Sequence, residues 1–120
     1  PARAGDLRPV LADDLLAERA LLGDAPARSA LVSRVHRTLQ QSPHLWETAA
    51  AYLEGGQGVE GTARALFVHA NTVRYRLGAI TRETGLDLAD PPDALTARLS
   101  LLWGRLDDAR KSPGQAVGRP

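Results

Sequence analysis

The stretch that decides the fold is TARALFVHANTVRYRLGAITRETG, which runs from Thr62 to Gly85. Its apolar side chains recur at spacings of three and four on both sides of a short break, at Ala63, Leu66, Val73, Leu77 and Ile80. Such spacing is typical of amphipathic helices. Val68 lies in the break, where an apolar side chain can fix the angle between two helices. The stretch therefore predicts a helix-turn-helix, with Ala63 as the small residue at the closest approach.

The second helix of this stretch has a polar outer face. We place Val73, Leu77 and Ile80 inward, with successive residues about 100° apart around the helix axis. The opposite side and its edges then carry a mostly polar set: Asn71, Thr72, Arg74, Tyr75, Gly78 and Arg82. A helix in the DNA major groove needs hydrogen-bonding groups near its N-terminus for base edges, and cations for phosphates. The outer face supplies both, so the sequence predicts a recognition helix near residues 71–84.

The candidate DNA-binding residues are His69, Asn71, Thr72, Arg74, Tyr75, Arg76 and Arg82. Arg74 and Tyr75 are the best candidates for contact with bases; the alternatives are an ion pair between Arg74 and an acid, and packing of Tyr75 on a neighbour. Arg76 lies nearer the inner face, which suits a structural salt bridge as well as a phosphate contact. Arg82 is far from the helix start, so we expect it to meet the DNA backbone rather than a base.

Three further positions around this helix have two interpretations each. Asn71 is the expected N-cap, and the free N–H groups of a helix N-terminus also favour a nearby phosphate. His69 lies in the turn, where it either donates to a phosphate or packs locally. Gly78 weakens a helix by up to about 1 kcal/mol relative to alanine, yet it also permits a close approach to the duplex.

The rest of the chain predicts further helices, and no window alternates as a strand would. We expect an all-α domain of about five to six helices. The helices are expected over about 9–22, 29–41, 43–55, 60–67, 71–84 and 91–109. Ser42 and Asp90 are the expected N-caps before prolines, and Gly55, Gly56 and Gly85 are the expected ends.

Packing roles can be assigned to several side chains outside the motif. Leu95, Leu99, Leu102 and Leu106 recur on one side of the last helix, which we expect to face the core. Trp46 and Trp103 lie beside apolar stripes and are expected to pack there. His36 and His44 match no metal-ligand spacing and are expected at the surface.

Composition limits the classes of function. The chain carries a net charge of +1, but four arginines and one glutamate lie between Val59 and Arg82, so this segment carries +3. Arginine supplies 14 of the 15 basic residues, a bias that GC-rich coding also produces. There is no cysteine, and no phosphate-binding loop, dinucleotide glycine pattern, nucleophile elbow or HExxH motif is present. We therefore expect no enzyme, no cofactor, no membrane segment and a cytoplasmic location.

The motif resembles a known family. ARALFVHANTVRYRLGAI, followed by TGLDLADPPDALTARLSL, is similar to the C-terminal DNA-binding domain of PucR-type bacterial transcriptional regulators, over about Leu31 to Leu106. Its two-helix core also resembles the Fis-type helix-turn-helix. The matching positions are Ala63, Leu66, Asn71, Thr72, Val73, Tyr75, Arg76 and Leu77. Members often carry arginine where this chain has Ala70, and a polar residue where it has Gly78, so two possible DNA contacts are absent.

These observations lead to one functional hypothesis and two alternatives. We expect sequence-specific binding of double-stranded DNA by a homodimer on two half-sites. The dimer contact is expected either from the N-terminal helix or from exposed parts of Trp103 and Leu106. The expected organisation is an N-terminal helix and linker over 1–28, leading from an upstream sensor domain, a DNA-binding domain over 29–109, and a flexible tail over 110–120. The alternatives are a helical protein-interaction module and a Fis-like architectural DNA-binding protein.

Overall fold

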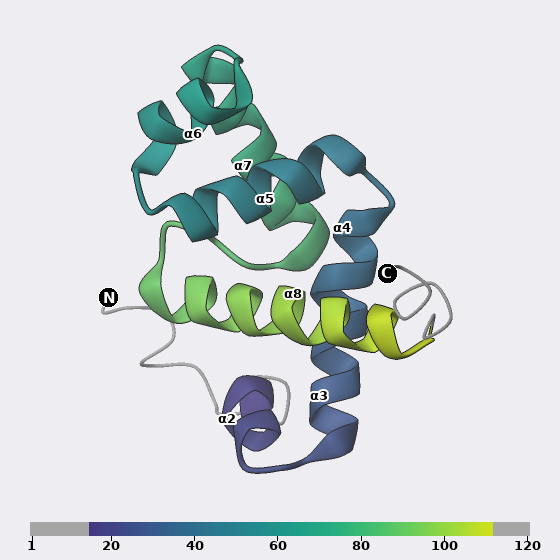
Figure 1. Ribbon diagram of the computed structural model, residues 1–120. Helices are drawn as coiled ribbons and strands as arrows, with labels where there is room; N and C mark the ends of the chain where they lie inside the picture. The colour runs from purple at the N-terminus through teal and green to yellow at the C-terminus, as the bar shows by residue number, and fades with distance from the viewer. Residues whose placement is uncertain (1–14, 112–120) are drawn as a thin grey trace, which may run out of the picture.

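The computed structural model describes residues 15–111, which form six helical rods without a strand among them (Figure 1). This confirms the all-α prediction. One rod is composite, because a π-helical segment joins two α-helical ones. In chain order the elements are α2 (Leu16–Leu21), the composite rod of α3 (Ala25–Leu31), η2 (Val32–Arg37) and α4 (Thr38–Gln40), α5 (Pro43–Gly55), α6 (Gly58–Leu66), α7 (Ala70–Thr84) and α8 (Pro91–Lys111). No described helix is both long and apolar enough to cross a bilayer.

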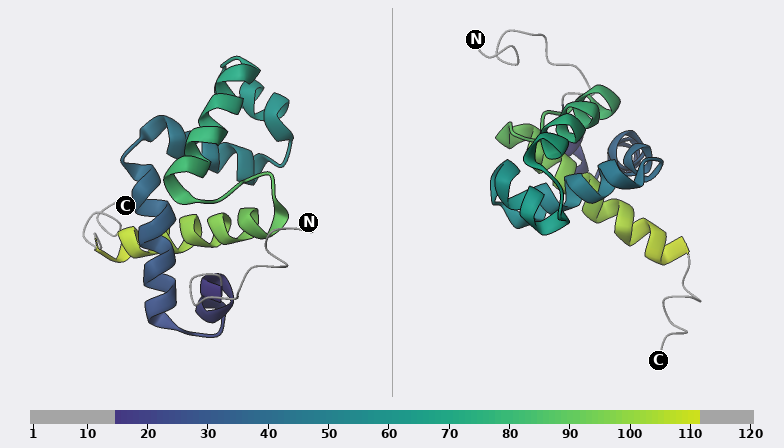
Figure 2. Two further views of the ribbon diagram at one scale, coloured as in Figure 1. Left: turned by 180° about the vertical axis from the view of Figure 1, so that it is seen from behind. Right: turned by 90° about the horizontal axis from the view of Figure 1, so that it is seen from above.

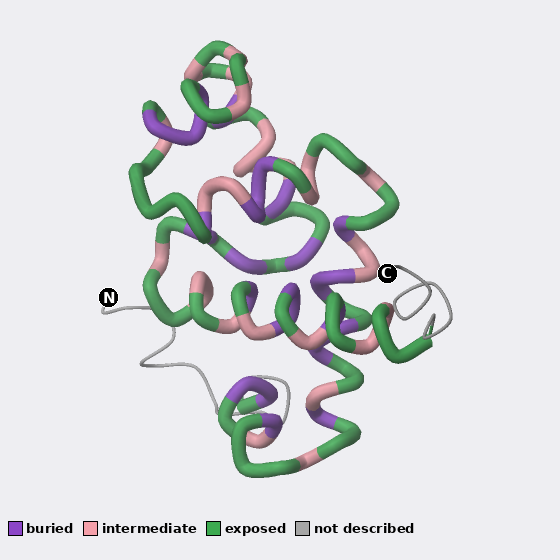
Figure 3. The backbone as a smooth tube through the Cα atoms, viewed as in Figure 1, coloured by how far each residue is buried: buried purple, intermediate pink, exposed green. Residues whose placement is uncertain are grey.

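Helix α8 divides the domain. It crosses the composite rod, with α5, α6 and α7 on one side and α2 on the other, and the view from behind shows α7 beside α5 (Figure 2). Two clusters of buried residues follow this division (Figure 3). The larger one joins the composite rod, α5, α7 and α8 through Val35, Leu39, Ala49, Leu53, Ile80, Leu86, Leu88, Ala97 and Leu101. The smaller one joins α2 and α3, with Leu99 and Trp103 of α8 packed on it.

The crossing of α8 over the π-helical segment is unusually close. Ala97, Ser100 and Gly104 of α8 are all buried at this crossing. A Cβ atom added at Gly104 would lie 2.1 Å from two ring carbons of His36, well inside van der Waals contact. Only glycine fits at this position, because the imidazole of His36 takes the space that any side chain would fill.

A serine hydroxyl from α8 enters the hydrogen-bond ladder of the composite rod. The backbone N–H of His36 donates to Ser100 Oγ at 3.2 Å, and the Ser100 hydroxyl donates to the carbonyl oxygen of Leu31 at 2.8 Å. Groups that insert into the regular ladder widen a helix locally. The hydroxyl thus satisfies backbone groups at the π-helical turn. The turn on one rod and the serine on the other therefore form a single structural feature.

His36 is fully buried, so the prediction that it lies at the surface was wrong. Trp46 Nε1 donates to its Nδ1 at 3.4 Å, which leaves the proton of a neutral ring on Nε2. Nε2 lies 3.1 Å from Asp108 Oδ2, and this hydrogen bond is the largest cause that holds the pKa of Asp108 below its usual value. Burial is tolerated because α5 and α8 provide partners for both nitrogens, partners that spacing along the chain could not reveal. His44 is exposed as expected.

The expected core face of α8 was also wrong. Leu95, Leu102 and Leu106 are 52%, 47% and 47% exposed, whereas the buried positions are Ala97, Ser100, Leu101 and Gly104. Helices that cross closely need small side chains at the contact. A prediction from hydrophobicity places the large apolar side chains there instead. Trp46 and Trp103 are partly buried against the two clusters, as predicted.

The composite rod begins earlier than the sequence pattern suggested. Asp24 caps α3, because its Oδ1 accepts from the N–H of Ala27 at 3.0 Å, and Pro26 occupies the first turn. The expected boundary between residues 28 and 29 therefore falls inside a helix. Of the helix expected over 9–22, residues 9–14 lie outside the described part, as do residues 112–120 of the expected tail.

The close crossing makes a testable prediction about Gly104→Ala. The added methyl group must displace His36 or separate the two rods, so we expect a loss of roughly 1–3 kcal/mol in the free energy of unfolding. Urea unfolding followed by circular dichroism measures this. Gly55→Ala is the matched control, because a Cβ there meets nothing within 4 Å, and it should leave the free energy of unfolding unchanged or slightly raised. Equal stability of the two variants would contradict the crossing described above.

Candidate nucleic-acid interface

Helices α6 and α7 form the predicted helix-turn-helix. At the end of α6 the chain reverses through a left-handed residue, Phe67, and the N–H of Val68 donates to the carbonyl oxygen of Ala63 at 3.0 Å. Ala63 is buried where the helices meet and Val68 is half-buried in the turn, as expected. Helix α7 then starts at Ala70, and both helices contact α5.

The N-cap of α7 is His69, so the assignment of Asn71 to that position was wrong. The Nδ1 atom of His69 accepts a hydrogen bond from the N–H of Asn71 at 3.0 Å. Asn71 is therefore already inside the helix, and its exposed amide is not needed as a cap. Histidine was missed because asparagine is the commoner cap.

The inner face of α7 is anchored as the periodicity predicted. Val73 and Ile80 are fully buried, and Leu77 is half-buried against the main core. The far end is held by Gly85 in the left-handed conformation and by Arg34, whose Nε donates to the carbonyl oxygen of Thr84 at 3.1 Å. With its phase fixed in this way, α7 turns its remaining side chains outward.

Arg74 and Asn71 form a coupled pair on the outer face. Arg74 Nη1 donates to Asn71 Oδ1 at 2.8 Å, and Arg74 Nη2 lies 3.4 Å from Glu60 Oε2 on α6. The ion pair expected as an alternative for Arg74 is therefore present. It is exposed on both sides, and such pairs contribute little to stability. The guanidinium group is held in place while it stays open to a stronger anionic partner.

Tyr75 and Arg82 form a second pair on the same face. Tyr75 is 70% exposed, and its neighbour on this face is Arg82, whose guanidinium carbon lies 5.8 Å from the centre of the tyrosine ring. Gly78 lies between them, and a Cβ there would come within 3.5 Å of Arg82 Nη1. This is an ordinary van der Waals distance, so the position of Arg82 over the ring does not by itself require glycine at residue 78.

Arg76 has a structural position in the protein. Its Nη1 donates to the hydroxyl of Thr48 at 3.2 Å, and Thr48 is fully buried in α5. This bond joins α7 to α5 and takes the place of the salt bridge expected as one alternative. Thr72 is half-buried at the edge of the outer face.

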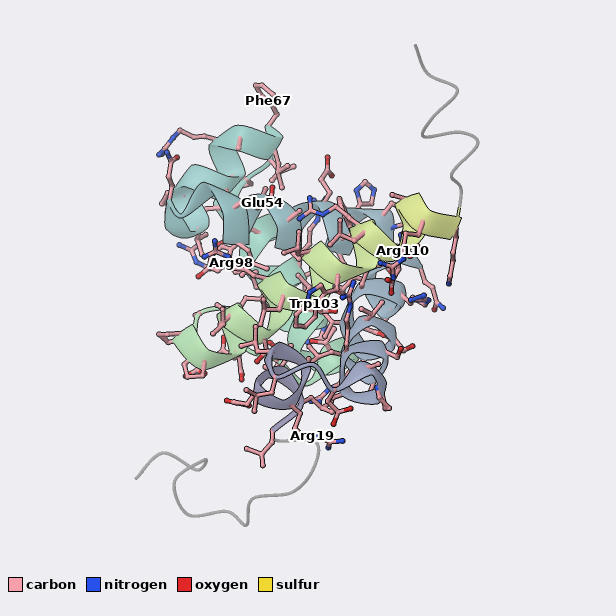
Figure 4. The ribbon with its side chains drawn as sticks, turned by 60° about the horizontal axis from the view of Figure 1, so that its bottom comes forward. Arg19, Glu54, Phe67, Arg98, Trp103 and Arg110 are labelled. Atoms are coloured by element: carbon pink, nitrogen blue, oxygen red, sulfur yellow. The ribbon has the colours of Figure 1, made fainter. Side chains whose placement is uncertain are left out.

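Sequence reasoning missed Phe67, which is the most unusual residue of the turn. It is the one non-glycine residue between 15 and 111 with a positive φ, 58°, and it is 94% exposed. The left-handed conformation costs a residue with a Cβ roughly 1–2 kcal/mol. Its side chain points away from the ribbon at the edge of the molecule (Figure 4). The signal in the sequence was the absence of glycine where a helix ends in a tight turn.

Around the turn runs a shallow open groove with both apolar and charged walls. Its lining is Glu60, Ala63, Arg64, Phe67, Val68, His69, Ala70 and Arg74. Nothing in residues 15–111 gathers three or more metal-ligating side chains. A convex helix edge with exposed amide, phenol and guanidinium groups, rather than an enclosed pocket, is suited to the groove of a nucleic acid. The fold and this edge define a helix-turn-helix domain.

Comparison with known proteins gives the family. Residues 45–103 match the PucR C-terminal helix-turn-helix domain. This part of the chain is thus a helix-turn-helix domain of the PucR family of transcriptional regulators, as the sequence motif implied. This type of domain belongs to transcriptional regulators and is not a catalytic domain.

Individual relatives agree with this assignment. The chain is 52% identical over 104 residues to an uncharacterized protein of Mycobacterium tuberculosis, a match that covers 86% of this chain and 25% of the relative. It is 36% identical to the carbohydrate diacid regulator of Escherichia coli over 62% of this chain and 18% of that regulator. A crystal structure of a regulator of polyketide synthase expression from Bifidobacterium adolescentis is similar with a TM-score of 0.79 and 43% identity, covering 84% of this chain and 43% of that one. The chain thus spans a quarter or less of these two curated relatives.

Proposed function

We propose that the chain binds a specific sequence of double-stranded DNA, with α7 in the major groove. The observation that carries the proposal is the division of α7 into two faces. Val73 and Ile80 are fully buried, whereas Asn71, Arg74 and Tyr75 are exposed near the helix start. Base edges in the major groove are read by side chains in this part of a recognition helix.

Each candidate residue has a distinct part in this proposal. Arg74 and Asn71 act together on bases, since their hydrogen bond already aligns the guanidinium group. Tyr75 and Thr72 line the same contact, with Tyr75 as the more exposed of the two. His69 and Arg82 lie at opposite ends of the face and meet phosphates, which supply much of the affinity of such proteins. Arg76 positions α7 through Thr48 rather than touching DNA.

The proposal includes a homodimer that forms through α8. Leu95, Leu99, Leu102 and Leu106 are spaced by four, three and four residues, the spacing of a coiled-coil seam. Leu95, Leu102 and Leu106 are about half exposed. Leu95, Leu99 and Leu102 line a groove with Leu53 of α5, beside Arg98 and Arg105. A second copy presents the same seam, so two such faces are complementary under a two-fold axis. Two recognition helices would then meet two half-sites of the DNA.

The proposal also concerns the longer protein. Because the curated relatives are much longer than the matching segment, we propose that this unit is joined on its N-terminal side to a sensor domain and acts in the cytoplasm. Residues 15–28 then belong to the DNA-binding unit as well as to the connection, since α2 and α3 pack on α8 through Leu99 and Trp103. A movement of the segment that leads to the sensor domain would therefore be passed to α8 through these packing contacts.

Selection of bound duplexes from a random pool tests the proposal. We expect the chain to enrich one sequence with two related half-sites, because the outer face of α7 offers several base-reading groups. Affinity for that duplex should fall steeply with salt as counterions are released. Enrichment of no sequence together with strong bending would favour an architectural protein, and weak binding to every duplex at low salt would favour a protein-interaction module.

Arg74→Ala tests the base contact. If the guanidinium group reads a base, the variant should lose about 1–3 kcal/mol of binding free energy for the selected duplex and lose preference at one position. Fluorescence anisotropy with the selected duplex and single-base variants measures both effects. Arg110→Ala is the control, because it removes an exposed arginine from the far end of α8. An unchanged base preference in Arg74→Ala would assign Arg74 to phosphates alone.

Leu102→Glu tests the dimer. A charge in the middle of the leucine seam should convert a dimer into a monomer that keeps its helical circular dichroism spectrum, since Leu102 is already 47% exposed. Sedimentation equilibrium measures the change. Leu22→Glu tests the N-terminal helix, which is the other surface expected to dimerise, and this change at an 87% exposed leucine outside the seam should leave the dimer intact. A variant at Leu102 that remains dimeric would place the interface elsewhere.

A further inference from the structure

Phe67 combines a strained backbone conformation with an apolar side chain that is exposed to water. Its backbone adopts φ 58° and ψ 45°, which glycine accepts without a steric penalty. Its ring is 94% exposed, more than any other large apolar side chain from residue 15 to 111. Neither feature is balanced by packing within the domain. A contact outside the domain is the simplest reason for a phenyl ring at this position.

The surroundings of the ring indicate what that contact is. Phe67 is three residues before the first residue of α7, and Figure 4 shows its side chain directed outward. Exposed Arg64 on α6, together with Arg74 and His69, shares the open groove around it. Beside the ring, the described lining of the groove adds only the small apolar surface of Ala63, Val68 and Ala70, and its one acid, Glu60, is paired with Arg74. This combination fits a surface that alternates apolar groups with anions, as a DNA strand does.

We propose that Phe67 is a DNA-contacting residue whose ring packs on an apolar group of the duplex beside the site of α7. The inference rests on the proposed function. Two groups of a DNA strand have the required chemistry, namely the 5-methyl group of thymine, which phenylalanine contacts in major grooves, and the deoxyribose ring. Arg64, one helical turn before Phe67, meets the adjoining phosphate. In this arrangement the strained turn holds the ring outside the fold, where the duplex can reach it.

Phe67→Gly separates this role from a structural one. Glycine keeps the left-handed turn and removes the ring, so the melting temperature should be unchanged or raised. Affinity for the selected duplex should nevertheless fall roughly 5- to 30-fold, the loss expected for one apolar contact. The salt dependence should stay the same, because the ring neutralises no phosphate. Phe67→Tyr, which keeps the ring, should retain the affinity.

Deoxyuridine scanning distinguishes the two groups on the DNA. Each thymine of the selected duplex is replaced in turn by deoxyuridine, which lacks the 5-methyl group. Weaker binding by the wild-type chain at one position, without a further loss in Phe67→Gly, assigns the contact to that methyl group. No position-dependent loss, with Phe67→Gly still weakened, assigns it to deoxyribose.

Three results would overturn the inference in distinguishable ways. Equal affinity of Phe67→Gly and the wild-type chain would show that the ring does not touch DNA, while the proposed function stands. A loss of affinity that accompanies a lower melting temperature would make Phe67 a structural residue. A wild-type chain that binds no duplex would refute the proposed function itself, and the ring would then face a protein partner.

Discussion

The contact between His36 and Gly104 is the constraint on which the rest of the domain depends. It sets the distance between the composite rod and α8, and the Ser100 hydroxyl locks that distance by bonding to Leu31 and to His36. Because the two rods are this close, Leu101 of α8 enters the same core as residues of α5 and α7. The π-helical turn is where the rod accommodates the hydroxyl in its ladder.

The core in turn determines which side of α7 meets solvent. Ile80 is buried in the cluster that α8 completes, and Arg34 holds the C-terminal end of α7 from the composite rod. Arg76 adds a third attachment, to Thr48 in α5. Three contacts to three different elements leave α7 no freedom to rotate. The exposure of Arg74 and Tyr75 is therefore a consequence of packing far from them.

The sequence predicted this helix well because α7 follows a regular pattern with large apolar residues inside. The phase of Val73 and Ile80 needed only the helical repeat. The same reasoning failed for α8, where the tight crossing buries Ser100 and Gly104 and leaves Leu102 partly exposed. It failed for His36 too, since the partners of a buried histidine come from distant elements. The hydrophobic pattern along a helix predicts which side faces away from water. The burial of these residues depends instead on the neighbouring helix that packs against them.

The cap of α7 has a chemical consequence of its own. His69 accepts the hydrogen bond from Asn71 through the lone pair of Nδ1. Because Nδ1 offers that lone pair, the proton of the neutral ring lies on Nε2. The bond that fastens the first turn of α7 thus leaves an exposed ring with one N–H donor that the cap does not use, at the end of the helix proposed to enter the groove first.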